Sequence, residues 1–135
     1  MGVVSVILLD THAWIWYLSS PDLLSPAALK AIEAARQKGK IYISCISTWE
    51  FFLLIKKGRL NLTVDEVAWI RRAEQLPFLE FVPIDNEICR LAVHLPELHL
   101  DPADRIIVAT CQLIGATLVT KDERLLLYPH ISTIG

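Results

Sequence analysis

The chain has 135 residues, of which 53% are hydrophobic, and it carries a formal net charge of −2. That charge gives no basic footprint for nucleic acid, and the three cysteines form no C-x-x-C pair that would indicate a zinc site. The longest uncharged stretch, Ile106 to Thr120, is shorter than the roughly 20 residues of a membrane span, and the N-terminus does not resemble a signal peptide. We therefore expect a cytoplasmic protein that does not enter a membrane.

Apolar runs of strand length alternate with helical patterns from one end of the chain to the other. The runs predict strands over Val4–Asp10, Ile41–Cys45, Glu80–Ile84, Ala116–Asp122 and His130–Ile134. Between them, capping residues, glycines and prolines predict helices over Thr11–Ser20, Pro26–Lys38, Thr48–Lys57, Val64–Leu76, Asn86–Leu95 and Pro102–Ile114. This alternation predicts an α/β fold of one domain, residues 1–135, with a mainly parallel sheet of four to five strands and helices on both faces.

Three of the predicted helices begin with a pattern typical of a capping box, in which a polar residue is followed three positions later by an acid. The pairs are Ser47 with Glu50, Thr63 with Glu66, and Asp101 with Asp104. An acid in the first turn also interacts favourably with the helix dipole. Capping alone would therefore account for Glu50 and for Asp104.

Capping does not so readily account for Asp10 and Asp122, each of which follows a predicted buried strand. The carboxyl ends of parallel strands meet at one sheet edge, where ligands bind. We expect Asp10, Glu50 and Asp122 at that edge, joined by Asp104 if its helix begins there. Clustered carboxylates repel one another unless a cation neutralises them, and all-oxygen ligands select Mg²⁺ or Mn²⁺. The sequence therefore predicts a metal site suited to phosphodiester hydrolysis.

Four segments, "LLDTHAWIW", "STWEFF", "LDPADRIIVATC" and "LVTKDERL", resemble in order the motifs of PIN-domain ribonucleases, and in particular the VapC-type toxins. The resemblance implies a three-layer α/β/α sandwich, a Mg²⁺ or Mn²⁺ cofactor and cleavage of RNA. It also implies a homodimer and inhibition by a cognate antitoxin protein. By motif, the catalytic and metal-binding acids correspond to Asp10, Glu50, Asp104 and Asp122.

The resemblance also assigns supporting roles around these acids. Thr120 matches a residue that supports the metal or the phosphate, and Arg105 matches one expected to orient Asp104. Thr11 and His12 follow Asp10 directly and are further supporting candidates. We interpret His12 as a hydrogen-bonded structural histidine, with a general-base role as the alternative.

Two other functions fit the same pattern. A PIN-like fold can serve as a non-catalytic binding or assembly module, although such a module has no need of all four acids. A nuclease that processes RNA or DNA without being a toxin would use identical chemistry. Setting the four acids aside leaves 13 basic against 11 acidic residues, which weakens the charge objection. Lys121 and Arg124 flank Asp122 and are candidates for phosphate contact, with surface solvation as the alternative.

One predicted helix contains the segment "WEFFLLI", Trp49 to Ile55, in which six of seven residues are apolar. A helix on the surface of a monomer buries only one stripe. This helix is therefore either central to the core, or covered on its outer face by another protein or by a large neighbouring side chain.

Overall fold

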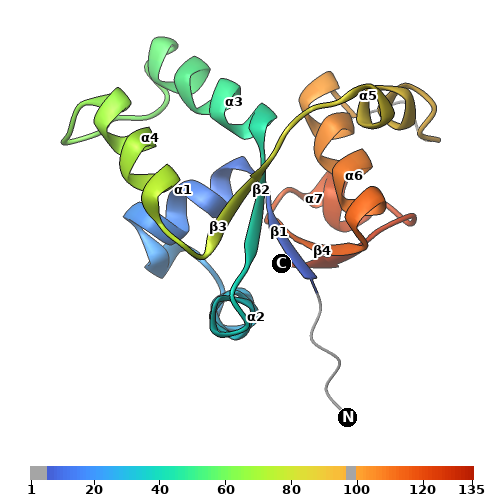
Figure 1. The fold of residues 1–135 in the computed structure, drawn as a ribbon, viewed down its shortest axis with the longest axis horizontal. Helices are drawn as coiled ribbons and strands as arrows, with labels where there is room; N and C mark the ends of the chain where they lie inside the picture. The colour runs from blue at the N-terminus through green and yellow to red at the C-terminus, as the bar shows by residue number, and fades with distance from the viewer. Residues whose placement is uncertain (1–5, 97–99) are drawn as a thin grey trace.

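The computed structural model describes residues 6–96 and 100–135 and contains a five-stranded sheet in which all neighbouring strands are parallel (Figure 1). The strand order is β3-β2-β1-β4-β5. The strands are β1 (Val6–Leu9), β2 (Ile41–Ser44), β3 (Leu79–Val82), β4 (Ala116–Val119) and β5 (Ser132–Ile134). The predicted parallel sheet is confirmed, while Val4 and Ser5 of the predicted first strand lie outside the described residues.

The connections between the strands are helical, as the alternating pattern predicted. They are α1 (Thr11–Ser19), the 3₁₀ helix η1 (Pro21–Leu23), α2 (Pro26–Gln37), α3 (Cys45–Lys56), α4 (Glu66–Gln75), α5 (Asn86–Val93), α6 (Pro102–Ile114) and α7 (Glu123–Leu126). Within the described residues, none of these helices has the length and apolar character needed to cross a membrane.

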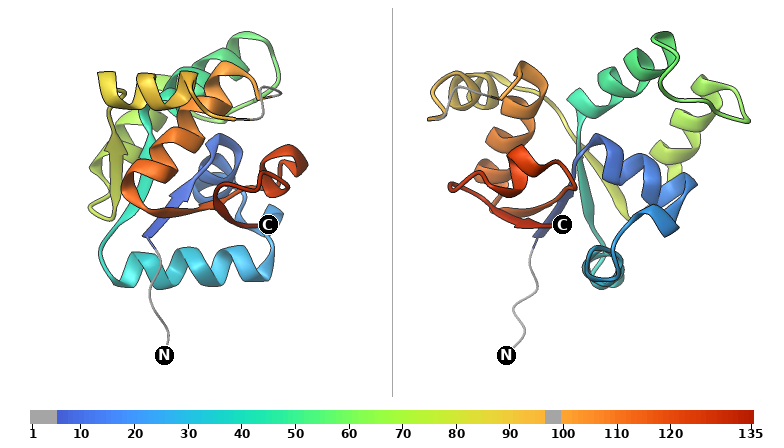
Figure 2. Two further views of the ribbon diagram at one scale, coloured as in Figure 1. Left: turned by 90° about the vertical axis from the view of Figure 1, so that its right-hand side faces the viewer. Right: turned by 180° about the vertical axis from the view of Figure 1, so that it is seen from behind.

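The central strand β1 separates two apolar cores, because successive side chains of a strand point to opposite faces. Ile7 and Leu9 belong to one core, which they form with residues of α1, α2, α3 and α4. Leu8 belongs to the other core, which is built mainly by α6 and β4. Helices therefore cover both faces of the sheet, in a three-layer α/β/α arrangement (Figures 1 and 2).

The helix that carries "WEFFLLI" is tied to the core through an aromatic cluster. Trp14 is fully buried, with ring centroids 5.2 Å from Trp69, 5.7 Å from Phe81 and 6.0 Å from Phe51. Phe51 in turn stacks on Trp69 at 4.6 Å. Of the two alternatives for this segment, the central one therefore holds for Phe51.

The start of α3 differs from the prediction in a way that matters for the site. Strand β2 ends at Ser44, whose side chain accepts a hydrogen bond from the Ile46 N–H at 3.1 Å and so caps the helix. The predicted cap at Ser47 is therefore wrong, since α3 begins directly after the strand, at Cys45. Glu50 consequently lies in the second turn of α3, and capping does not explain its presence.

The three capping patterns thus have different outcomes. In α4 the cap is Asp65, which accepts from the Ala68 N–H at 3.1 Å, so the prediction of Thr63 is wrong. In α6 the prediction is confirmed: Asp101 accepts from the Asp104 N–H at 2.8 Å.

Candidate active site

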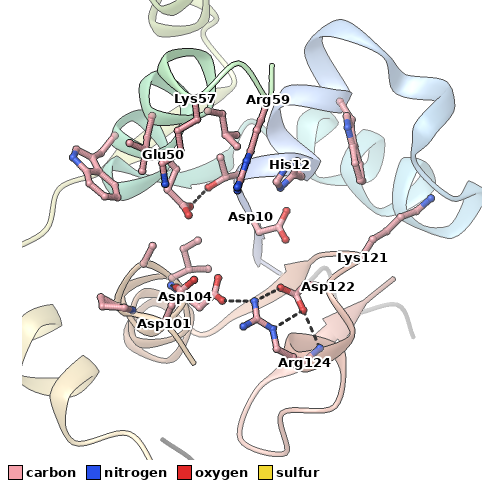
Figure 3. Close-up of a pocket in the computed structure, with 18 residues that line it drawn as sticks. Asp10, His12, Glu50, Lys57, Arg59, Asp101, Asp104, Lys121, Asp122 and Arg124 are labelled. Atoms are coloured by element: carbon pink, nitrogen blue, oxygen red, sulfur yellow. Dashed lines mark hydrogen bonds and ion pairs between the residues drawn. The ribbon is translucent and has the colours of Figure 1, made fainter. Parts of the chain in front are cut away.

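A pocket of about 760 Å³ opens at the carboxyl edge of the sheet, where β1, β2 and β4 end (Figure 3). Five acidic residues line it: the four predicted from the motifs and Asp101. They come from four places in the chain, namely the β1–α1 junction, α3, the start of α6 and the β4–α7 junction. The pocket therefore brings together acids that are far apart in sequence. Its lining comprises Asp10, Thr11, His12, Trp16, Trp49, Glu50, Leu53, Leu54, Lys57, Arg59, Asp101, Pro102, Ala103, Asp104, Ile107, Lys121, Asp122 and Arg124.

Asp10 lies at the end of the central strand and caps α1. Its carboxylate accepts the Ala13 N–H at 2.8 Å and the Thr120 hydroxyl at 2.5 Å. The residue is only 8% exposed, and this burial raises the pKa of Asp10 above its ordinary value, although both hydrogen bonds act in the opposite direction. Capping thus does account for part of the role of Asp10, contrary to what the sequence alone indicated.

Glu50 faces the pocket from the second turn of α3. The Thr11 hydroxyl donates a hydrogen bond to its carboxylate and also lies 2.8 Å from the hydroxyl of Ser47. Ser47 and Thr11 are both buried. Burial raises the pKa of Glu50, and the neighbouring charges of Asp101 and Asp10 add to the effect.

Asp104 is held by the first turn of α6 with its side chain only 12% exposed. The pKa of Asp104 is raised to about 7, chiefly by burial and in addition by the negative charges of Asp101, Asp122 and Glu50, while Arg124 acts in the opposite direction. A carboxyl group with this pKa loses its proton near neutral pH. Asp104 is thus an acid whose charge the surrounding protein only partly compensates.

Asp122 caps α7 and forms an ion pair with Arg124. It accepts the Arg124 N–H at 2.9 Å, and the Arg124 guanidinium contacts both of its oxygens, at 2.9 and 3.3 Å (Figure 3). The same guanidinium reaches Asp104 at 3.1 Å. These hydrogen bonds keep the pKa of Asp122 below its ordinary value.

Arg105 does not have the role that the resemblance implied. Its guanidinium donates to the carbonyl oxygens of Ala92 at 2.9 Å and of Leu100 at 3.4 Å, so it links α5 to the residue before the cap of α6. Adjacent residues on a helix do not face the same way, which explains why Arg105 turns away from Asp104. The arginine that contacts Asp104 is Arg124, for which the sequence predicted contact with phosphate or surface solvation.

His12 also differs from its interpretation as a hydrogen-bonded structural histidine. Within the described residues its ring has no hydrogen bond, and it lies exposed at the pocket with its centroid 5.6 Å from that of Trp16. The Nζ of Lys121 lies 5.8 Å from the centroid of Trp16 and donates a hydrogen bond to the carbonyl oxygen of Leu23. This side of the pocket is therefore aromatic and basic.

Two further cations and a tryptophan line the pocket from α3 and the loop after it. Lys57 and Arg59 are exposed and, among the described residues, have no ion pair with an acid. Trp49 is 58% exposed although it is adjacent to Glu50. The pocket thus combines an acidic centre with basic and aromatic walls (Figure 3).

The donor types in this pocket suit Mg²⁺ or Mn²⁺. Carboxylate oxygens are the ligands such hard cations prefer. Burial, the main cause of the raised pKa values of Asp10, Glu50 and Asp104, makes their charged forms costly unless a positive charge lies close by. As the side chains stand, no three His, Cys, Asp or Glu side chains in the described part of the chain are grouped closely enough to hold an ion. Contacts with Thr120, Thr11 and Arg124 engage the carboxylates instead.

This chain is similar to known proteins in both its sequence and its fold. Residues 7–130 match the PIN domain. The chain is 34% identical over 128 residues to ribonuclease VapC22 of Mycobacterium tuberculosis, an alignment that covers 94% of this chain and 95% of that protein.

Solved structures of lower sequence identity share the fold. VapBC2 of Rickettsia felis, bound to a DNA fragment from its promoter, superposes with a TM-score of 0.70 at 17% identity, covering 96% of this chain and 97% of that one. A toxin–antitoxin complex from Klebsiella pneumoniae gives a TM-score of 0.64 at 22% identity, covering 96% of both chains.

Proposed function

Because this chain belongs to the PIN domain family, as its motifs predicted, we propose that the pocket is the active site of a Mg²⁺- or Mn²⁺-dependent endoribonuclease that acts as the toxin of a toxin–antitoxin pair. The observation that carries the proposal is the convergence of Asp10, Glu50, Asp104 and Asp122 in one pocket. The similarity to a ribonuclease along nearly the whole chain supports RNA as the substrate. RNA as a substrate also supports a cytoplasmic location.

In this proposal the four acids share one task, and Glu50 has a second. Asp10, Asp104 and Asp122, with Glu50, would hold the divalent cation, which would supply Lewis-acid stabilisation of the charge on the phosphate. Glu50 positions the attacking water and takes its proton as the water oxygen bonds to phosphorus and the bond to the leaving oxygen breaks. Burial raises the pKa of Glu50 above its ordinary value, which makes its carboxylate a stronger base. Thr11 holds Glu50 in position, and Thr120 does the same for Asp10.

Lys57 and Arg59 are proposed to contact the RNA backbone on one side of this acidic centre. We expect the double variant Lys57→Gln/Arg59→Gln to bind single-stranded RNA more weakly and to reduce the slope of log affinity against log salt by about 1 to 1.5, since each lost phosphate contact removes roughly 0.7 from it. Fluorescence anisotropy across a salt series, with chelator present to prevent cleavage, measures both quantities.

The matched control for this prediction is Lys30→Gln/Lys38→Gln, which removes the same charge. Both lysines are exposed, at α2 and its C-terminal end, and neither lines the pocket. The control should retain the wild-type slope. Equal losses in the two double variants would mean that net charge alone acts, which would contradict a specific contact at Lys57 and Arg59.

An antitoxin and a second copy of the chain are the proposed protein partners. One of the similar solved structures is a toxin–antitoxin complex. The exposed Trp49 and the half-buried Leu53 and Leu54 give α3 an apolar surface on the pocket wall. Such a surface beside the acidic centre suits the apolar face of a partner helix.

The catalytic proposal is tested by incubating the purified protein with a panel of single-stranded RNAs and with DNAs of the same sequences. Each reaction is run with Mg²⁺, with Mn²⁺ and with chelator. We expect discrete RNA fragments that chelator abolishes. An Asp104→Asn protein purified in parallel reports any contaminating nuclease. No cleavage of any substrate, together with no Mn²⁺ binding by calorimetry, would overturn the proposal and favour a binding or assembly module.

A further inference from the structure

The Arg124 side chain bridges two acids that come from different elements. Its Nη2 lies 3.1 Å from Asp104 Oδ2 and 2.9 Å from Asp122 Oδ2, and its Nε lies 3.3 Å from Asp122 Oδ1. Asp104 belongs to α6, whereas Asp122 precedes α7. The guanidinium thus occupies the space between two of the carboxylates that the proposed function assigns to the metal (Figure 3).

This arginine supplies positive charge to the same oxygen atoms that a divalent cation would need. It lowers the pKa of Asp122 and acts in the same direction on Asp104, against the effect of burial. A hard cation binds carboxylate oxygens at roughly 2.0–2.6 Å. A guanidinium hydrogen-bonded to the same oxygens occupies the position that such a cation would take. The two positive charges would also repel one another at that separation.

We propose that Arg124 is an internal competitor of the catalytic metal ion, which holds Asp104 and Asp122 together and is displaced when the divalent cation binds. The inference rests on the proposed function, because it needs the acids to be metal ligands. Its consequence is that the chain reduces its own affinity for the cation. Arg124 is 54% exposed, so its side chain can leave the two acids for solvent without unfolding α7.

The competition is measured by calorimetric titration with Mn²⁺ at about pH 8, above the pKa of about 7 of Asp104. We expect Arg124→Gln to bind Mn²⁺ roughly 5- to 10-fold more tightly than wild type, since a two-carboxylate ion pair no longer has to be broken. Arg124→Lys should fall between them, because an ammonium group lacks the planar fork that reaches both carboxylates.

Arg90→Gln is the matched control. Arg90 is 58% exposed and also makes two hydrogen bonds to a carboxylate, that of Glu87, but it lies on α5 and does not line the pocket. Its variant should bind Mn²⁺ with wild-type affinity. Unchanged or weaker Mn²⁺ binding by Arg124→Gln, with tight binding by the wild type, would show that Arg124 does not compete with the ion.

Thermal unfolding provides a readout that does not depend on titration heats. With chelator, Arg124→Gln should melt at a lower temperature than wild type, and saturating Mn²⁺ should close the difference, because the ion pair is then broken in both proteins. Any difference caused by Arg90→Gln should persist with Mn²⁺. If neither the wild type nor Arg124→Gln binds Mn²⁺, the metal site itself is wrong, and both this inference and the proposed function are overturned.

Discussion

Replacement of Asp104 by asparagine is expected to reduce metal-dependent RNA cleavage by at least about a thousandfold while leaving the fold intact. The variant keeps the shape of the side chain and removes its negative charge. The contact that starts α6 does not depend on that charge, because Asp101 accepts the backbone N–H of residue 104. The loss would therefore report on the metal site and not on the helix.

The expected size of the effect follows from the surroundings of Asp104. Its side chain is 12% exposed and lies among other acids, so few water molecules can compensate for the lost carboxylate charge. An amide oxygen carries no full charge and binds a hard cation more weakly than a carboxylate.

The measurement is a single-turnover cleavage rate at saturating Mn²⁺, with Asp85→Asn as the control. Asp85 caps α5 by accepting the Ile88 N–H at 2.9 Å and does not line the pocket. Asparagine caps a helix as well as aspartate does, so the control loses the same charge and should cleave within about twofold of wild type. A rate for Asp104→Asn within tenfold of wild type would reduce Asp104 to a structural residue.

The positions of these acids were predictable because two simple signals agreed. Short apolar runs defined the strands, and parallel strands bring their carboxyl ends to one edge. Asp10 follows β1 and Asp122 comes shortly after β4, so their convergence in one pocket depended only on the order and direction of the strands.

The local explanation for each acid was much less predictable. Sequence alone favoured capping for Glu50, yet Glu50 lies inside α3, whereas Asp10 and Asp122 are the residues that cap helices. The reason is that Ser44 and Ser47 are both good caps, and only the pairing of β2 with β3, which extends to Ser44, decides between them. The pairing of β2 with β3 therefore determines where α3 begins.

The partners of the arginines were not predictable either. Arg105 is adjacent to Asp104 in sequence and Arg124 is 20 residues away, yet Arg124 makes the contact. A helix turns by about 100° per residue, so neighbours in sequence diverge in space. A long side chain from α7 can reach Asp104 because α6 packs against β4 in the same core, and the chain returns through β4 to the edge at which α6 begins.

The second large effect concerns folding stability and pH. The pKa of Asp104 is about 7 in the folded chain, against an ordinary value of 3.8. Between these values the unfolded carboxyl has lost its proton and the folded one has kept it, so stability falls as pH rises. At about 1.4 kcal/mol per pKa unit, Asp104 is expected to cost roughly 4 kcal/mol above pH 7 when no divalent cation is bound.

Asp104→Asn should therefore be more stable than wild type in chelator above about pH 7, by up to roughly 4 kcal/mol, and equal to it below about pH 4. Denaturant unfolding at a series of pH values measures the difference, which isolates Asp104 because every other titrating group is common to both proteins. Asp85→Asn should follow the wild-type profile. Saturating Mn²⁺ should make the wild type the more stable protein at pH 8. The bound cation stabilises the wild type, whereas the variant has one metal ligand fewer. A difference that stays constant from pH 4 to pH 8 would show that the Asp104 carboxyl titrates normally, and the electrostatic argument for a cation in this pocket would lose its main support.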